Sequence, residues 1–151
     1  MEKWTVEMKI KHLEMIENII QRMANNSFLL KGWTVSLVVA IFVLSDAEMN
    51  QLYFLFGYIP VILFWALDSY YLQMERKYVI LYDKIRVTDD LVDFDLSIKN
   101  ITYEKEKNST LKYVNSLFSV TEWLFYCPIA IIFTAVYRQD IACILNGIFS
   151  R

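Results

Sequence analysis

Three apolar runs dominate this chain and restrict the folds that are open to it. They are SFLLKGWTVSLVVAIFVLS at 27–45, LYFLFGYIPVILFWAL at 52–67 and LFSVTEWLFYCPIAIIFTAVY at 117–137. Helices that are apolar on all sides cannot all be buried in a soluble domain of 151 residues, of which 56% are hydrophobic. The runs therefore predict three transmembrane helices, at 28–45, 52–68 and 117–137.

Segments of mixed charge surround these runs. Residues 1–26 predict an amphipathic cytoplasmic helix that docks on another helix, a second protomer or the membrane surface. Its apolar stripe recurs at steps of three and four: Val6, Ile10, Leu13, Ile16, Ile20 and Met23. We expect the second span to continue as a cytoplasmic helix to about residue 87, before a polar connector at 88–112. Residues 138–151 are expected to form an outer tail, which completes a single all-α integral membrane domain over 1–151.

Lysine and arginine are distributed unevenly around the three spans. Five of the fifteen precede the apolar part of the first span, eight lie between the second and third spans, and two follow the third. The short turn between the first two spans has none. The positive-inside rule therefore predicts a membrane protein with a cytoplasmic N-terminus and connector. The hairpin turn and the C-terminus are expected on the opposite side, which is the periplasmic side if the membrane is a bacterial inner membrane.

Each predicted span carries one charged residue near its cytoplasmic end, with a tryptophan close by. The pairs are Lys31 with Trp33, Asp68 with Trp65, and Glu122 with Trp123. Counting along the hairpin at 1.5 Å per residue places Lys31 and Asp68 at similar depth. Because tryptophan favours the membrane interface, one interpretation is a shared cytoplasmic boundary with the three tryptophans as interfacial anchors.

The spans are short for this interpretation. Between the charges and the outer ends, each apolar stretch has about 13–16 residues, or about 20–24 Å of helix, against a hydrocarbon core of about 30 Å. Aspartate and glutamate, unlike lysine, are too short to reach water from inside that core. The alternative is therefore a membrane-edge polar cluster of Lys31, Asp68 and Glu122. In it Lys31 pairs with Asp68, and Glu122 is protonated or pairs with Arg76 or another protomer.

Two further patterns concern the helix surfaces. Gly32, Ser36 and Ala40 stand at strict four-residue spacing on one face of the first span. Small residues at this spacing let helices approach closely in lipid, so they predict a helix-packing face towards the second span, the third span or another protomer. After the second span comes a cytoplasmic charge group, namely Glu75, Arg76 and Lys77.

Catalytic motifs are missing from the sequence. It contains no glycine-rich phosphate loop, HExxH, paired CxxC or nucleophile elbow, which predicts a protein that is not an enzyme and binds no cofactor or metal. His12 is expected to be a surface or packing residue. The acidic cluster lacks the spacing of a calcium loop and is expected to be solvated; its members are Asp89, Asp90, Asp93 and Asp95. Cys127 and Cys143 lie in apolar surroundings and predict free thiols.

The pieces HLEMIENIIQRMANNSFLLKGW, FWALDSYYLQMERKYVILYDKIR and DFDLS together resemble a widespread group of small bacterial membrane proteins. The layout is similar to that of the two-transmembrane, SLATT-like effectors of anti-phage and nucleotide-signalling operons. This resemblance implies an oligomeric, membrane-perturbing or pore-forming effector, with the lipid bilayer, copies of itself and a cytoplasmic protein or nucleotide signal as partners. Net charge is −2, so no nucleic acid is expected. The alternative is a membrane adaptor that docks a soluble partner through Tyr78–Arg86 and the connector.

Overall fold

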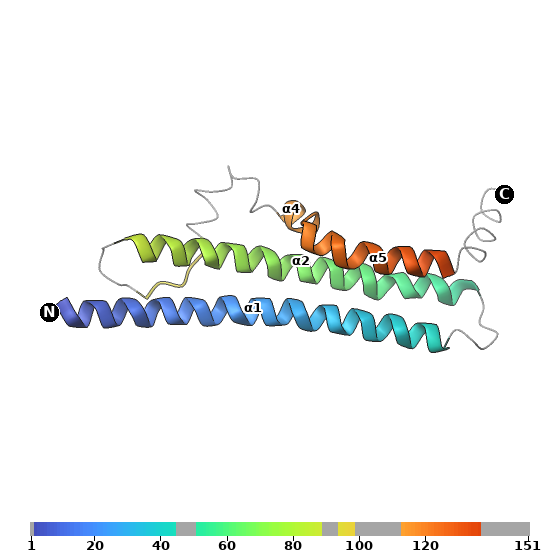
Figure 1. Cartoon of the computed structure of the whole chain (residues 1–151), viewed down its shortest axis with the longest axis horizontal. Coiled ribbons are helices and arrows are strands. Elements are labelled where there is room, and N and C mark those ends of the chain that lie inside the picture. Colours follow the sequence, from blue (N-terminus) through green and yellow to red (C-terminus); the bar gives the residue numbers. More distant parts are fainter. Residues whose placement is uncertain (1, 45–50, 89–93, 99–112, 137–151) are drawn as a thin grey trace. The chain divides into compact units, whose positions relative to one another are not determined.

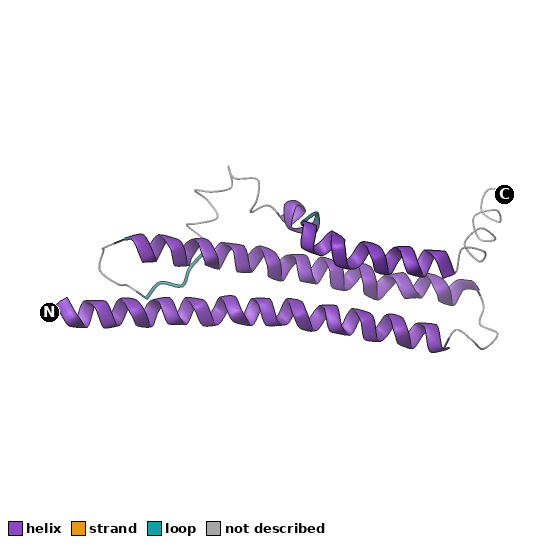
Figure 2. Cartoon of the chain, in the orientation of Figure 1, coloured by secondary structure: helices purple, strands orange, loops and turns teal. Residues whose placement is uncertain are grey.

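The computed structural model describes residues 2–44, 51–88, 94–98 and 113–136, which are helical apart from short loops and contain no strand (Figures 1 and 2). The prediction of an all-α fold is confirmed. The helices are α1 (Glu2–Leu44), α2 (Gln51–Val87), α4 (Tyr113–Leu117) and α5 (Val120–Val136). Two compact units divide the chain: unit 1 is Met1–Phe28 with Ser69–Ser116, and unit 2 is Leu29–Asp68 with Leu117–Arg151. Both α1 and α2 contribute residues to each unit.

Helix α1 is uninterrupted over 43 residues, so the predicted segments 1–26 and 28–45 form one helix. The residues that join them, Ala24 to Ser27, include neither glycine nor proline, and nothing there breaks the backbone hydrogen bonds. The first two residues of the predicted apolar stripe, Val6 and Ile10, are not buried, because each is about half exposed. His12 is buried instead, since this face of α1 meets the segment at 94–98.

Helix α2 continues from the second apolar run through the charged residues to Val87, the end that the sequence predicted. Pro60 lies inside it, and the helix continues beyond that residue. At the C-terminus the backbone N–H and the hydroxyl of Thr88 both donate to the Lys84 carbonyl, at 3.1 and 2.7 Å. Lys84 and Arg86 lie in the last turn, where positive charge interacts favourably with the helix dipole.

The predicted third span, 117–137, is not one helix. Helix α4 ends at Leu117, the chain turns at Phe118 and Ser119, and α5 begins at Val120. The Ser119 carbonyl accepts the Trp123 N–H at 3.0 Å, which makes Ser119 the residue that caps α5. Serine is among the residues preferred at this position, so a local capping preference interrupts the apolar run.

The core of unit 1 joins the first half of α1 to the second half of α2. Ile16 and Leu81 are buried at its centre. Residues packed around them come from both helices and from the loop: Ile20, Tyr78, Ile80, Tyr82, Ile85, Leu96 and Ile98. The N-terminal amphipathic stretch therefore docks on another helix of the same chain, which was one of the three options that the sequence left open.

The core of unit 2 is built by α1, α2 and α5. Val38, Val61, Tyr126 and Phe133 are buried there. Gly57 lets α2 come close to α5, because a Cβ atom on Gly57 would stand 2.2 Å from Cζ of Phe133. The Phe133 ring is also held by Phe42 and Tyr58, whose ring centroids lie 5.4 and 4.9 Å away.

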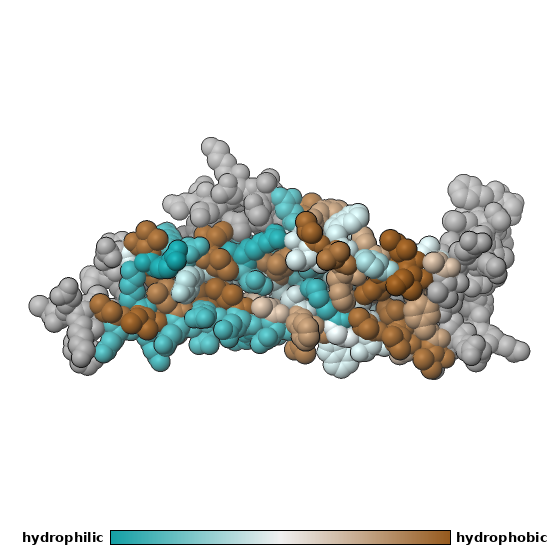
Figure 3. Space-filling view, viewed as in Figure 1, coloured by the Kyte–Doolittle hydropathy of each residue, from teal (hydrophilic) through white to brown (hydrophobic). Residues whose placement is uncertain are grey.

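One helix among the described residues, α1, is long and apolar enough to cross a membrane, within Val6–Val43. Helix α5 contains a shorter apolar stretch, Val120–Ala135. In the space-filling view, hydrophobic residues gather on the visible face of unit 2, whereas hydrophilic and hydrophobic residues are mixed on that of unit 1 (Figure 3). The hairpin turn at 45–50, most of the connector, Cys143 and the tail at 138–151 lie outside the described residues.

Candidate functional site

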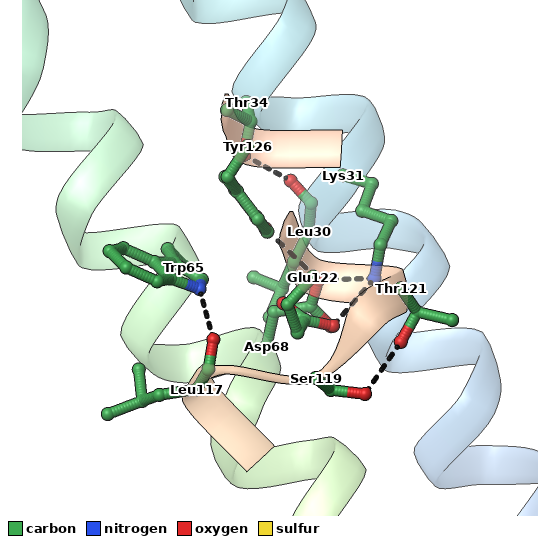
Figure 4. A network of polar contacts seen from close by, with 10 residues as sticks. All are labelled: Leu30, Lys31, Thr34, Trp65, Asp68, Leu117, Ser119, Thr121, Glu122 and Tyr126. Atoms are coloured by element: carbon green, nitrogen blue, oxygen red, sulfur yellow. Dashed lines mark hydrogen bonds and ion pairs between the residues drawn. The ribbon is translucent and has the colours of Figure 1, made fainter. Parts of the chain in front are cut away.

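Three charged side chains meet inside unit 2, one from each of its long helices (Figure 4). Lys31 on α1 donates a hydrogen bond to Oδ2 of Asp68 on α2. The same Nζ lies 3.4 Å from Oε1 of Glu122 on α5. Lys31, Asp68 and Glu122 are also the only charged residues within the described part of unit 2. We call them the polar triad.

The triad is enclosed by protein. The carboxyl side chains of Asp68 and Glu122 are 0% and 1% exposed, and the Lys31 side chain is 23% exposed. Of the two interpretations of these charges, a simple boundary would leave each of them facing water or headgroups. The structure instead brings them together as an internal cluster. Arg76, considered from the sequence as a partner for Glu122, belongs to unit 1 and donates to Ser116 Oγ at 3.4 Å.

Aromatic side chains line the triad. The hydroxyl group of Tyr126 donates to Asp68 Oδ2 at 3.1 Å, and the Trp65 ring stacks on Tyr126 with centroids 6.3 Å apart. The Lys31 ammonium lies 5.9 Å from the centroid of Phe125, within reach of a cation–π interaction. Sequence reasoning missed Tyr126. Its position four residues after Glu122, on the same face of a helix, is the signal that could have identified it.

Two oxygens of the triad are buried without a hydrogen-bond partner, namely Oδ1 of Asp68 and Oε2 of Glu122. Each carboxyl group thus engages Lys31 through one oxygen and leaves the other unsatisfied. A buried polar atom without a partner costs about 1–3 kcal/mol, so such atoms are uncommon outside functional sites. The site therefore has spare acceptor capacity in an enclosed place.

The start of α5 explains how Glu122 reaches this position. Ser119 and Glu122 form a Ser-x-x-Glu sequence, in which the glutamate usually folds back onto the backbone of the capping residue. Here Glu122 Oε1 turns to Lys31 instead, and Ser119 Oγ lies 3.2 Å from Thr121 Oγ1. Glu122 lies in the first turn of α5.

The small-residue face on α1 lies on the surface of the described part of unit 2. Gly32, Ser36 and Ala40 are all exposed, and a Cβ atom on Gly32 would meet no atom within 4 Å. This excludes packing of the face against α2 or α5 and leaves packing between protomers as the prediction. The Ser36 hydroxyl donates to the Gly32 carbonyl at 2.9 Å, so its polar hydrogen is satisfied within its own helix.

The three tryptophans differ from one another. Trp33 and Trp123 are exposed, as interfacial anchors must be. Trp65 is half-buried, and its indole N–H donates to the Leu117 carbonyl at 3.1 Å. It therefore ties α2 to the end of α4, which is a packing role that the sequence analysis did not assign to it.

The charge group at 75–77 and His12 lie in unit 1. In the cytoplasmic charge group, Lys77 is buried while Glu75 and Arg76 are partly exposed. His12 is 2% exposed, with Nε2 lying 3.2 Å from the Asp95 carbonyl and its ring 5.4 Å from that of Phe94. It is a packing residue.

Of the acidic cluster, only Asp95 is described. Its Oδ1 accepts the Ser97 N–H at 2.8 Å. Cys127, in unit 2, is a half-buried free thiol.

No group of three or more His, Cys, Asp or Glu side chains within the described ranges could hold a metal ion. The triad has the wrong composition for one, because its third member is a cation. No protein-family model, no curated protein and no solved structure matches the chain. What the site does must therefore be inferred from its own geometry.

Proposed function

We propose that unit 2 lies within a membrane. The observation that carries this proposal is its reversed distribution of polarity: all its described charged side chains are clustered inside, and its outer surface is apolar. The exposed large apolar residues come from all three helices and include Leu29, Val39, Val43, Ile59, Ile62, Leu63, Leu124, Ile131 and Ile132. A soluble domain rarely exposes so much contiguous apolar surface, whereas lipid requires it.

Within this proposal α1, α2 and α5 all cross the bacterial inner membrane, which makes the protein multi-pass. The distribution of Lys and Arg supports a cytoplasmic N-terminus and connector and a periplasmic C-terminus. Unit 1, whose core is built from amphipathic stretches, then lies on the cytoplasmic side.

The function that we propose is that of an oligomeric, non-enzymatic effector that perturbs or permeabilises this membrane. Protomers pack through the exposed face of Gly32, Ser36 and Ala40, where close helix approach in lipid is possible. A polar triad at the membrane edge supports the role, because charged groups inside transmembrane segments are costly and usually serve a function. The anti-phage setting, and a cytoplasmic protein or nucleotide as the trigger, rest on the resemblance in layout alone.

Expression in bacteria with a fluorescent probe of membrane potential tests the effector proposal. The wild-type protein is expected to depolarise the cells, and Lys31→Ala or Asp68→Ala is expected to reduce the effect. Ala40→Leu should also reduce it, by separating protomers. Ala135→Leu is the matched control, since it makes the same change at an exposed alanine on α5. An unchanged membrane potential in cells with abundant wild-type protein contradicts the proposal, and a monomer in detergent excludes its pore-forming version.

The adaptor alternative needs a free docking surface on Tyr78–Arg86. Most apolar residues of this stretch pack into the core of unit 1, with Leu81 only 7% exposed, so little apolar surface is left for a partner. A soluble partner recovered with the wild-type protein and with Asp68→Ala, but lost when the connector is deleted, would favour the adaptor.

A further inference from the structure

We propose that the polar triad is a proton-binding site, in which the carboxyl group of Glu122 takes up one proton and releases it again. This inference rests on the membrane placement proposed above for unit 2. The effector proposal requires only that the triad contains buried charged groups. The inference goes further and gives the site a ligand, the proton.

Charge balance is the first support. The triad holds one ammonium group and two carboxyl groups, so with all three ionised it carries one excess negative charge in an enclosed place. Within the described part of unit 2 no other cation is present to balance it. Burying an uncompensated charge costs several kcal/mol, and addition of one proton removes that cost.

The hydrogen bonds decide which carboxyl group binds the proton. Asp68 Oδ2 accepts two bonds, from Lys31 Nζ and from the Tyr126 hydroxyl group. Glu122 receives only the longer contact from Lys31, at 3.4 Å. Hydrogen bonds that a carboxylate accepts stabilise its charged form, so Asp68 keeps the negative charge and Glu122 is protonated. These are the charged or titratable side chains that face Glu122 from α1, α2 and α5: Lys31, Asp68 and Tyr126.

The unsatisfied oxygens fit a proton better than a metal ion. Each carboxyl group leaves one buried oxygen without a partner, and a proton on one of them turns an acceptor into a donor. A metal cation requires several more oxygen ligands, and it would have to sit beside the Lys31 ammonium group, which repels it. The site therefore suits a proton.

Infrared spectroscopy of the purified full-length protein in detergent tests the inference through the C=O stretching band of a protonated carboxyl group. Wild-type protein at neutral pH is expected to show this band, which should weaken as the pH is raised from acidic to alkaline values. The band should disappear in Glu122→Gln. It should remain in Glu17→Gln, which makes the same change at an exposed carboxyl group of unit 1.

Isotope labelling gives the same answer in the unaltered protein, in case Glu122→Gln does not fold. Labelling the side-chain carboxyl of glutamate should shift the band, and labelling that of aspartate should not. The inference is overturned if wild-type protein shows no such band over this pH range. It is equally overturned if the band shifts with labelled aspartate, or if it responds to sodium at constant pH.

The infrared experiment and the membrane-potential experiment can fail separately. A carboxyl band in a protein that does not depolarise cells contradicts only the effector proposal. Depolarisation by a protein without the band contradicts only the proton site.

Discussion

Lys31 is the residue on which the two buried carboxyl groups depend. Its ammonium group contacts both, and the contact with Asp68 joins α1 to α2 while that with Glu122 joins α1 to α5. The net stabilisation from such a buried arrangement is small, because desolvation offsets most of the attraction. Removal of one partner has a large effect, since it leaves charge in the interior without compensation.

We expect Lys31→Met to destabilise the protein by about 3 kcal/mol, because both carboxyl groups then lose their cation. Denaturant unfolding in detergent micelles measures the change. Lys11→Met is the control, since Lys11 pairs with Glu14 at the surface and its side chain is 72% exposed. Adding Asp68→Asn to Lys31→Met should restore part of the stability. Additive losses from the two substitutions would contradict the pairing.

Two glycines of unit 2 make a second prediction. Gly57→Ala should destabilise the protein by about 1–3 kcal/mol, because the new methyl group would overlap the Phe133 ring, which other aromatic rings hold in place. Gly32→Ala should leave protomer stability intact, since its methyl group meets no atom within 4 Å. Thermal unfolding of the two variants side by side provides the measurement. Equal stability of the two would show that α2 and α5 are not in close contact at Gly57.

At the scale of the elements, the helices were more predictable than their ends and faces. The periodicity of α2 indicated its continuation to Val87, because apolar positions recur on one side through the charged region. The predicted start of α5 was wrong, because hydropathy does not reveal a serine cap inside an apolar run. The prediction of which residues are buried in the first part of α1 was also wrong, because burial of His12 depends on a loop more than eighty residues later in the chain.

That loop, residues 94–98, gives a prediction for one element. His12→Ala removes the contact with the Asp95 carbonyl and the ring contact with Phe94, so the loop should separate from α1 more often. Amide hydrogen exchange across 94–98 should become about tenfold faster, which corresponds to the loss of about one hydrogen bond. Met15→Ala, at an exposed position on α1, should leave exchange unchanged. The same rates in His12→Ala and wild type would mean that His12 does not hold the loop.

For the whole molecule, the sequence predicted the partners in the triad better than their surroundings. Depth along a hairpin can be counted from residue numbers, so Lys31 and Asp68 were expected to be level. That Lys31 contacts both carboxyl groups, and that Tyr126 joins them, depends on the rotation of three helices about their axes. Hydropathy alone does not specify rotation when a helix is apolar on every side.

Membrane placement of unit 2 leads to a prediction about its surface. Ile131→Lys puts a charge on an exposed apolar position of α5 and should cost about 3 kcal/mol if that position faces lipid. Val114→Lys makes a similar change on unit 1 and should be tolerated. The amount of each variant that stays folded in the washed membrane fraction is the readout. Equal amounts of the two variants would place the Ile131 surface in water.

The close contact at Gly57 also bears on how α2 and α5 are aligned along their axes at the triad. Eleven residues separate Gly57 from Asp68 on α2, and eleven separate Glu122 from Phe133 on α5. Eleven residues are about three helical turns, so both residues of each helix lie on the same side. If the two antiparallel helices were shifted by one turn along their axes, Phe133 would meet a bulky side chain such as Val61. Asp68 and Glu122 would then no longer lie opposite each other. Because Gly57 has no side chain, α2 and α5 pack closely in the one alignment that places the carboxyl groups of Asp68 and Glu122 side by side, three helical turns away.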